Sequence, residues 1–199
     1  MNAVRVSREP EIWVATQDAD TARATATPWD VKAAPADPRW RRAEFLAGRG
    51  LLRTLLRAVA PEHAERDVVT EESGRPVLAG TRRIAVSVSH DGDRVAAGVG
   101  RCASLGVDLQ VPPTELSDAL IRRCVRSPLS AAPVARALEF AWIWSVQEAC
   151  VKASGQGLAG APWLIDVEPG ATSGRWGNYR WQALRQSAVP LSFAYAVGR

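Results

Sequence analysis

The sequence has few of the residues from which metal and redox sites are usually built. It contains two histidines, His63 and His90, and three cysteines, Cys102, Cys124 and Cys150. The cysteines lie far apart, without the paired spacing of zinc ligands or the pattern of a disulfide framework. We therefore expect no metal site of histidine and cysteine, and free thiols in a reducing compartment, which indicates a cytoplasmic protein.

Long apolar runs and blocks of basic residues are also missing. No apolar stretch approaches the ~18 residues that cross a bilayer, and the polar N-terminus lacks the apolar segment of a signal peptide. Lysine occurs only at Lys32 and Lys152, and no segment resembles a polybasic tail. These absences predict a protein that neither spans a membrane nor takes nucleic acid as a partner.

The remaining composition is that of an ordinary globular protein. The chain has 199 residues, of which 47% are hydrophobic and 23% charged. This length can bury a core as one domain or as two small ones. The net charge of +4 suits an anionic partner, such as a phosphate or an acidic protein.

Apolar periodicity predicts helices and strands in a repeated order. Helical spacing predicts two long helices, over 40–59 and 135–153, the first capped by Asp37-Pro38. A shorter helix is expected over about 115–123. Alternation of apolar and small polar residues predicts strands, at residues 11–15, 84–89, 94–100 and 104–110 and in the final third from 163 to 197.

Helices followed by strands thus occur twice along the chain. This order predicts the α+β fold class, with two similar α+β halves over residues 1–103 and 104–199.

One face of the second long helix carries a carboxylate beside an ammonium group. Trp144, Glu148 and Lys152 are spaced by four residues, so they are neighbours on the helix surface. One interpretation is a surface ion pair beside a core tryptophan. The other is a phosphate site, in which Glu148 binds Mg²⁺ or accepts a proton and Lys152 neutralises phosphate oxygens.

A second candidate lies on the strand at residues 104–110. Asp108 and Gln110 are two residues apart and face the same side of a strand. A lone aspartate near a strand end is commonly a cap or a turn partner. If Asp108 faces Glu148, however, two carboxylates and the amide oxygen of Gln110 can hold one Mg²⁺.

Further polar residues can bind phosphate. Ser89 and His90 leave the strand at 84–89, and the first long helix carries several arginines, among them Arg42, Arg49 and Arg53. Ser89-His90-Asp91 also suggests a hydrolase triad. Adjacent strand residues point in opposite directions and no Gly-x-Ser-x-Gly turn is present, so the triad is disfavoured.

Taken in order, these segments resemble the Sfp-type 4'-phosphopantetheinyl transferases. The resemblance covers about residues 40–158 and rests on an ordered set of motifs. They are Gly48-Arg49, Gly74-Arg75-Pro76, Ser89-His90, Gly106-Val107-Asp108-Leu109-Gln110, Arg126-Ser127-Pro128 and Trp144-Ser145-Val146-Gln147-Glu148-Ala149-Cys150-Val151-Lys152.

The resemblance implies two halves related by a pseudo-twofold axis, with coenzyme A in the cleft between them. It implies a role for each matching residue: Arg49, Ser89 and His90 at the 3'-phosphate, Arg75 and Pro76 at the adenine, Asp108, Gln110 and Glu148 at Mg²⁺, Lys152 at a phosphate, and Glu148 with Lys152 in catalysis.

The reaction implied is transfer of the 4'-phosphopantetheine arm to a serine of an acyl or peptidyl carrier protein, with release of 3',5'-ADP. Such a reaction serves fatty-acid, polyketide or nonribosomal peptide biosynthesis. The family also implies a monomer.

Two departures from the motifs fall near the implied active centre. Gln110 stands in place of a metal-binding glutamate, and Gln147 in place of the lysine before Glu148. The first change weakens a metal ligand, so Gln110→Glu is expected to strengthen the Mg²⁺ response. The second removes a positive charge from near the phosphates. The alternative function is therefore a family member that binds coenzyme A or a carrier protein without catalysis.

Overall fold

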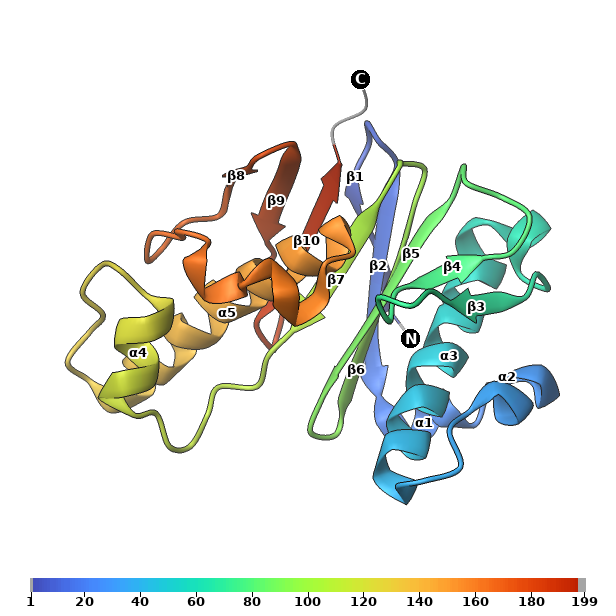
Figure 1. Ribbon diagram of the computed structural model, residues 1–199, viewed down its shortest axis with the longest axis horizontal. Coiled ribbons are helices and arrows are strands. Elements are labelled where there is room, and N and C mark those ends of the chain that lie inside the picture. The colour runs from blue at the N-terminus through green and yellow to red at the C-terminus, as the bar shows by residue number, and fades with distance from the viewer. Residues whose placement is uncertain (1, 197–199) are drawn as a thin grey trace.

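The computed structural model describes residues 2–196 and contains two four-stranded antiparallel sheets, each covered by one long helix (Figure 1). The first sheet has the order β1-β2-β6-β5. Its strands are β1 (Asn2–Ser7), β2 (Ile12–Asp18), β5 (Ala85–Asp91) and β6 (Arg94–Gly100). The covering helix is α3 (Arg39–Val59).

The second sheet has the order β7-β10-β9-β8. Its strands are β7 (Leu105–Leu109), β8 (Ser173–Trp176), β9 (Tyr179–Ala183) and β10 (Leu191–Ala196). Helix α5 (Pro133–Ser154) covers it. Asp108 of β7 pairs with Ser192 of β10, and Ser89 of β5 pairs with Ala96 of β6. The predicted α+β class is confirmed.

Shorter elements complete each part of the chain. They are α1 (Ala19–Arg23), α2 (Pro28–Ala33), η1 (Pro61–His63), β3 (Val68–Thr70), β4 (Pro76–Leu78), α4 (Asp118–Cys124), η2 (Gly157–Gly160) and η3 (Pro162–Leu164). Strands β3 and β4 pair with each other in a separate small sheet. No helix among residues 2–196 is both long enough and apolar enough to cross a membrane.

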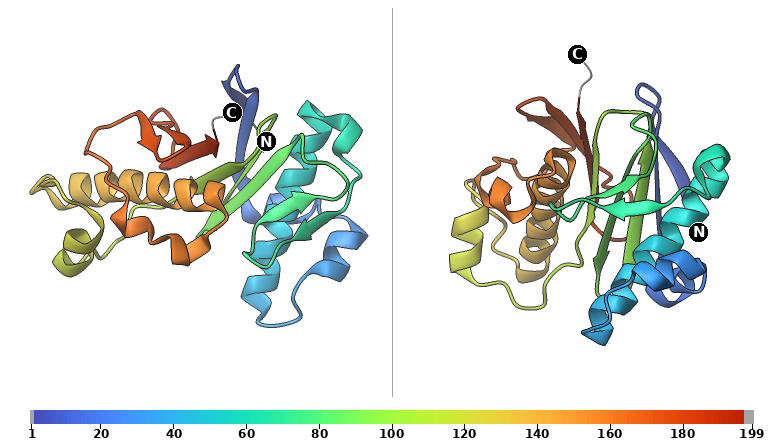
Figure 2. Two further views of the ribbon diagram at one scale, coloured as in Figure 1. Left: turned by 45° about the horizontal axis from the view of Figure 1, so that its top comes forward. Right: turned by 45° about the vertical axis from the view of Figure 1, so that its right-hand side comes forward.

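Three apolar clusters hold these layers together. One lies between α3 and the first sheet, and one between α5 and the second sheet. The third joins the sheets to each other, where Ile12 and Val14 of β2 meet Val107 of β7 and Phe193 of β10. The order of layers is therefore helix, sheet, sheet, helix, with α3 and α5 on opposite sides of the strands (Figure 2).

The long elements agree with the sequence predictions, and so do two short ones: the strand expected over 11–15 is β2, and the helix expected over about 115–123 is α4. The two long helices and the strands from 84 to 110 are confirmed as α3, α5, β5, β6 and β7. The expected cap at Asp37 is wrong, because α3 begins after Pro38 and no side chain caps it. Strand β1 and helices α1 and α2 were not predicted, and strands of the final third begin only at Ser173.

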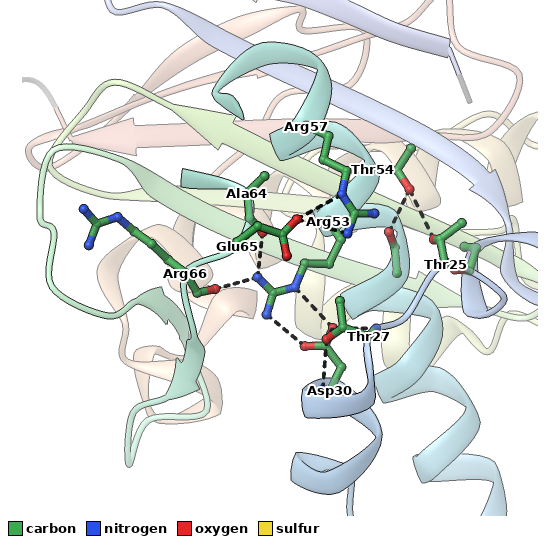
Figure 3. Close-up of polar contacts among 11 residues, drawn as sticks. Thr25, Thr27, Asp30, Arg53, Thr54, Arg57, Ala64, Glu65 and Arg66 are labelled. Atoms are coloured by element: carbon green, nitrogen blue, oxygen red, sulfur yellow. Dashed lines mark hydrogen bonds and ion pairs between the residues drawn. The ribbon is translucent and has the colours of Figure 1, made fainter. Parts of the chain in front are cut away.

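A buried ion pair fixes α2 to α3 (Figure 3). Arg53 donates Nε to Asp30 Oδ2 and Nη2 to Asp30 Oδ1, each at 3.2 Å, and Nη1 donates to the carbonyls of Ala64 and Arg66. Burial raises the pKa of Asp30, but hydrogen bonds from Arg53 and Thr27 outweigh burial, so the pKa lies below its usual value. The pair is structural.

This arrangement corrects part of the expectation for the arginines of α3. Arg53 is committed to Asp30 and to backbone carbonyls and is almost fully buried. Arg42 donates to three carbonyls of the segment before the helix, those of Val31, Ala34 and Pro35. Both side chains position α2 and the loop after it, so neither is free to bind phosphate.

Replacing Asp30 by asparagine should lower the free energy of unfolding by about 3–5 kcal/mol, because the buried Arg53 charge loses its partner. Urea unfolding measures this loss. Asp20→Asn is the matched control, since the Asp20–Arg23 pair is exposed and such pairs contribute about 1 kcal/mol or less. Equal losses in the two variants would contradict the structural role of the buried pair.

Candidate active site at the seam between the sheets

Strand β5, at the edge of the first sheet, runs beside β7, at the edge of the second, and side chains join them. Three N–H groups, two on β7 and one on Val111 two residues beyond it, each donate to a side-chain oxygen on β5. The pairs are Val107 N to Ser87 Oγ at 2.9 Å, Leu109 N to Ser89 Oγ at 3.3 Å and Val111 N to Asp91 Oδ2 at 2.7 Å. We call this row of hydrogen bonds the seam.

Helix α5 lies directly against β7 beside the seam. Gly106 makes this possible: a Cβ atom there would lie 2.0 Å from the Ala149 carbonyl oxygen and 2.5 Å from the Ala153 nitrogen. Asp108 is two residues further and faces the same side of the strand. It therefore lies against the helix face that carries Glu148 and Lys152.

Asp108, Lys152 and Ser89 form one hydrogen-bonded group across three elements. Asp108 is only 5% exposed. Its Oδ1 accepts a hydrogen bond from Lys152 Nζ at 2.5 Å and another from Ser89 Oγ at 2.7 Å. Lys152 Nζ also donates to Ser89 Oγ at 2.9 Å. We call these three side chains together with Glu148 the seam cluster.

The seam cluster holds two carboxylates near one ammonium group. Burial raises the pKa of Asp108, while Lys152 and the hydrogen bond from Ser89 lower it, with a net upward shift. Burial and the Asp108 charge raise the pKa of Glu148, and Lys152 lowers it, again with a net upward shift. Burial is the largest cause of both shifts, so the two carboxylates lie in a site that is poorly solvated by water.

The donor set fits Mg²⁺, which usually takes one or two protein carboxylates together with waters and substrate phosphates. Within the described residues, Glu148 accepts no hydrogen bond, and Asp108 uses only Oδ1. No group of three or more His, Cys, Asp or Glu side chains forms a metal site within residues 2–196. A cation at the cluster would therefore need oxygens from the substrate or water.

Gln110 is connected to the seam cluster only indirectly. Its Nε2 donates to Asp91 Oδ2 at 2.6 Å and to the Val111 carbonyl at 3.1 Å. The sequence suggests Asp91 only as part of a hydrolase triad. Its role on the seam is visible in the alternation of Ser87, Ser89 and Asp91, which places all three on one face of the strand.

His90 faces the other way, and the hydrolase triad fails. Its imidazole is 45% exposed, and Nε2 lies 3.5 Å from a Glu44 carboxylate oxygen on α3. Ser89 bonds Asp108, and Asp91 bonds Gln110 and Val111. The three adjacent residues thus have three different sets of partners.

The side chain of Arg49, on α3, is buried and has a nitrogen without a hydrogen-bond partner among the described residues. It is 4% exposed, and its Nη2 donates to Thr70 Oγ1 at 3.0 Å. Nη1 is buried and has no hydrogen-bond acceptor among the described residues. Burial lowers the pKa of Arg49 to about 10, so the guanidinium keeps its charge at neutral pH. A buried cation with a free donor is suited to an anion.

Arg75 and Pro76 border a pocket of about 530 Å³ between β4, β5 and β7. Arg75 Nε donates to Glu71 at 2.9 Å, and its guanidinium also lies next to Gly155 at the end of α5. The pocket also includes Ser104, whose buried hydroxyl has no partner among the described residues. The pocket therefore contacts both halves of the chain.

The sequence predicted that glutamine at position 147 removes a positive charge from near the phosphates, and this is wrong because the side chain does not face the seam cluster. The side chain is fully buried, and Nε2 donates to the carbonyls of Cys124 at 2.7 Å and Ile165 at 2.8 Å. It makes no hydrogen bond to the seam cluster. Position 147 therefore ties α5 to neighbouring loops, and a glutamine there removes no charge that faces the cluster.

Gly106→Ala should lower the free energy of unfolding by about 3 kcal/mol or more, because the new methyl group meets the α5 backbone. Gly48→Ala is the control: a Cβ at position 48 makes only ordinary contact with Val88, at 3.5 Å, and alanine is favoured in a helix. Urea unfolding compares them. Unchanged stability of Gly106→Ala would contradict the close approach of β7 and α5.

A comparison with protein-family models finds a match. The family model described as 4'-phosphopantetheinyl transferase N-terminal domain matches residues 31–100, which include Arg49, Arg75, Ser89 and His90. A search of the curated proteins gives no match. Residues 31–100 thus resemble the N-terminal domain of the 4'-phosphopantetheinyl transferases, and the α+β fold is consistent with that superfamily.

Proposed function

We propose that this protein is an Sfp-type 4'-phosphopantetheinyl transferase. It transfers the 4'-phosphopantetheine arm of coenzyme A to a serine of an acyl or peptidyl carrier protein and releases 3',5'-ADP. The observation that carries the proposal is the seam cluster, in which Asp108, Lys152 and Ser89 are hydrogen-bonded beside Glu148. It lies where the two sheets meet, between the proposed halves at residues 1–103 and 104–199.

In this proposal the nucleotide part of coenzyme A contacts residues of the first half. Arg49 and His90, whose imidazole approaches Glu44 on the same helix as Arg49, bind the 3'-phosphate. The resemblance also assigns Ser89 to this phosphate, but its hydroxyl lies in the seam cluster. Arg75 and Pro76 border the adenine. The unused, buried Nη1 of Arg49 supports an anion there. The pocket of about 530 Å³ beside Arg75 and Pro76 supports a ring-sized ligand.

Asp108 and Glu148 would hold Mg²⁺, with the amide oxygen of Gln110 as a further candidate ligand. Bound Mg²⁺ supplies charge neutralisation at the pyrophosphate. Lys152 contributes a second positive charge at the phosphates. Its present contact with Asp108, at 2.5 Å, places the ammonium at the cluster before any substrate arrives.

Glu148 is the proposed general base. The carrier serine hydroxyl gives its proton to the Glu148 carboxylate, and its oxygen forms a bond to the β-phosphorus. The bond between that phosphorus and the bridging oxygen breaks, and the electron pair leaves with 3',5'-ADP.

The proposed protein partner is acidic. Carrier proteins of this class are typically acidic, and the net charge of +4 favours their approach. The exposed apolar side chains Leu120 and Val134 lie close in sequence to Arg122 and Arg136, so that part of the surface offers both charge and apolar contact. We propose that the protein acts as a monomer in the cytoplasm.

Intact-mass spectrometry of apo carrier proteins tests the proposal. Each carrier is incubated with this protein, coenzyme A and Mg²⁺. A mass gain of one phosphopantetheine group that disappears without the metal is the expected result. Coenzyme A binding without a mass gain on any carrier would instead favour the non-catalytic binder.

Glu148→Gln should lower the transfer rate by about 10²-fold or more, since the variant lacks the proton acceptor. Coenzyme A binding should persist, because the nucleotide contacts lie elsewhere. The same mass assay measures transfer, and titration calorimetry measures binding. Asp20→Asn, which also replaces a carboxylate by an amide but on the exposed helix α1, is the control. Full activity of Glu148→Gln would remove Glu148 from the mechanism.

A further inference from the structure

Asp91 occupies a position that neither the motifs nor the proposed chemistry explains. It ends β5 and is half-buried. One of its oxygens, Oδ2, accepts two hydrogen bonds, from Gln110 Nε2 at 2.6 Å and from Val111 N at 2.7 Å. The contact with Val111 N is the third hydrogen bond of the seam. Asp91 is the only one of the three seam side chains on β5 that also bonds Gln110 among the described residues.

The Gln110 amide is oriented by these contacts. Both of its N–H donors have acceptors, Asp91 and the Val111 carbonyl. An amide held through its nitrogen presents its oxygen in a fixed direction. Asp91 therefore determines the orientation of the one neutral residue among the proposed metal ligands.

Asp91 also lies close to the seam cluster along β5. It is two residues from Ser89, whose hydroxyl donates to Asp108, and both side chains accept from N–H groups on the same side of the seam. A glutamate at position 110 would place a second carboxylate oxygen where Nε2 now lies, 2.6 Å from Asp91 Oδ2. Like charges at that distance repel each other strongly. Glutamine is thus the residue that fits beside an ionised Asp91.

We propose that Asp91 is a positioning residue of the active site: it orients Gln110 and supplies, from β5, the negative charge that Gln110 does not carry. The inference rests on the proposed function. It reverses the expectation that Gln110→Glu strengthens the Mg²⁺ response, because the new carboxylate would face Asp91.

The test is a charge exchange between the two positions. Asp91→Asn keeps an oxygen for Val111 N but removes the charge. Gln110→Glu sets two carboxylates against each other. The double variant Asp91→Asn/Gln110→Glu moves the charge to position 110 and lets the new amide at position 91 donate to the new carboxylate. Asp93→Asn is the control, an exposed carboxylate in the same hairpin.

Titration calorimetry of coenzyme A with and without Mg²⁺ is the measurement. Each single variant should lose about tenfold or more of the Mg²⁺-dependent gain in affinity. The double variant should bind more tightly than either single variant, and Asp93→Asn should match the wild type. The melting temperature without Mg²⁺ is a second readout. If the role of Asp91 were purely structural, its replacement would lower the melting temperature and leave the Mg²⁺ response unchanged.

Two results would overturn the inference while leaving the proposed function in place. One is a wild-type Mg²⁺ response in Asp91→Asn. The other is a double variant whose loss equals the sum of the single losses, because independent sites add and coupled sites do not. A wild-type protein whose coenzyme A affinity does not respond to Mg²⁺ would overturn the proposed metal site, and this inference with it.

Discussion

The seam between β5 and β7 is the constraint on which the rest of the structure depends. Two sheets meet there at their edges, and the N–H groups of β7 that face β5 need acceptors. Serine and aspartate side chains provide them. A buried N–H without a partner costs about 1–3 kcal/mol. The row of three side chains therefore fixes the register of one half of the chain against the other.

The same register places the seam cluster. Ser89 belongs both to the seam and to the seam cluster, since its hydroxyl accepts from Leu109 N and donates to Asp108. On the other side of β7, the absence of a side chain at Gly106 brings the α5 backbone close enough for Lys152 to reach Asp108. Charged groups of β7 and α5 thus meet a hydroxyl group of β5 where backbone packing brings the three elements together.

Burying Asp108 and Glu148 next to each other is electrostatically unfavourable, as is common in sites that bind charged ligands. Asp108 is buried beside Glu148, and each carboxylate has a raised pKa. A cluster selected only for stability would balance its charges within the protein. Arg53 and Asp30 show this alternative in the same chain, with a bidentate buried pair and a lowered carboxyl pKa.

The sequence predicted the elements and residues whose signals are local. Helices α3 and α5 follow from apolar periodicity, the Glu148–Lys152 neighbourhood follows from helical spacing, and the phosphate chemistry follows from the ordered motifs. The sequence could not assign Arg42, Arg53 and Gln147, because their partners are carbonyls and a carboxylate brought near by folding. For the same reason, the partnership of Gln110 with Asp91 becomes visible only when β5 lies beside β7.

The seam cluster is proposed to bind the pyrophosphate of coenzyme A together with a divalent cation. A crystal structure with coenzyme A and Mn²⁺ tests this most directly, since Mn²⁺ shares the oxygen-ligand preference of Mg²⁺ and gives an anomalous signal. We predict an anomalous peak at the carboxylates of Asp108 and Glu148, with a phosphate oxygen contacting Lys152. Coenzyme A bound elsewhere, or bound without a peak at these carboxylates, would contradict the proposal.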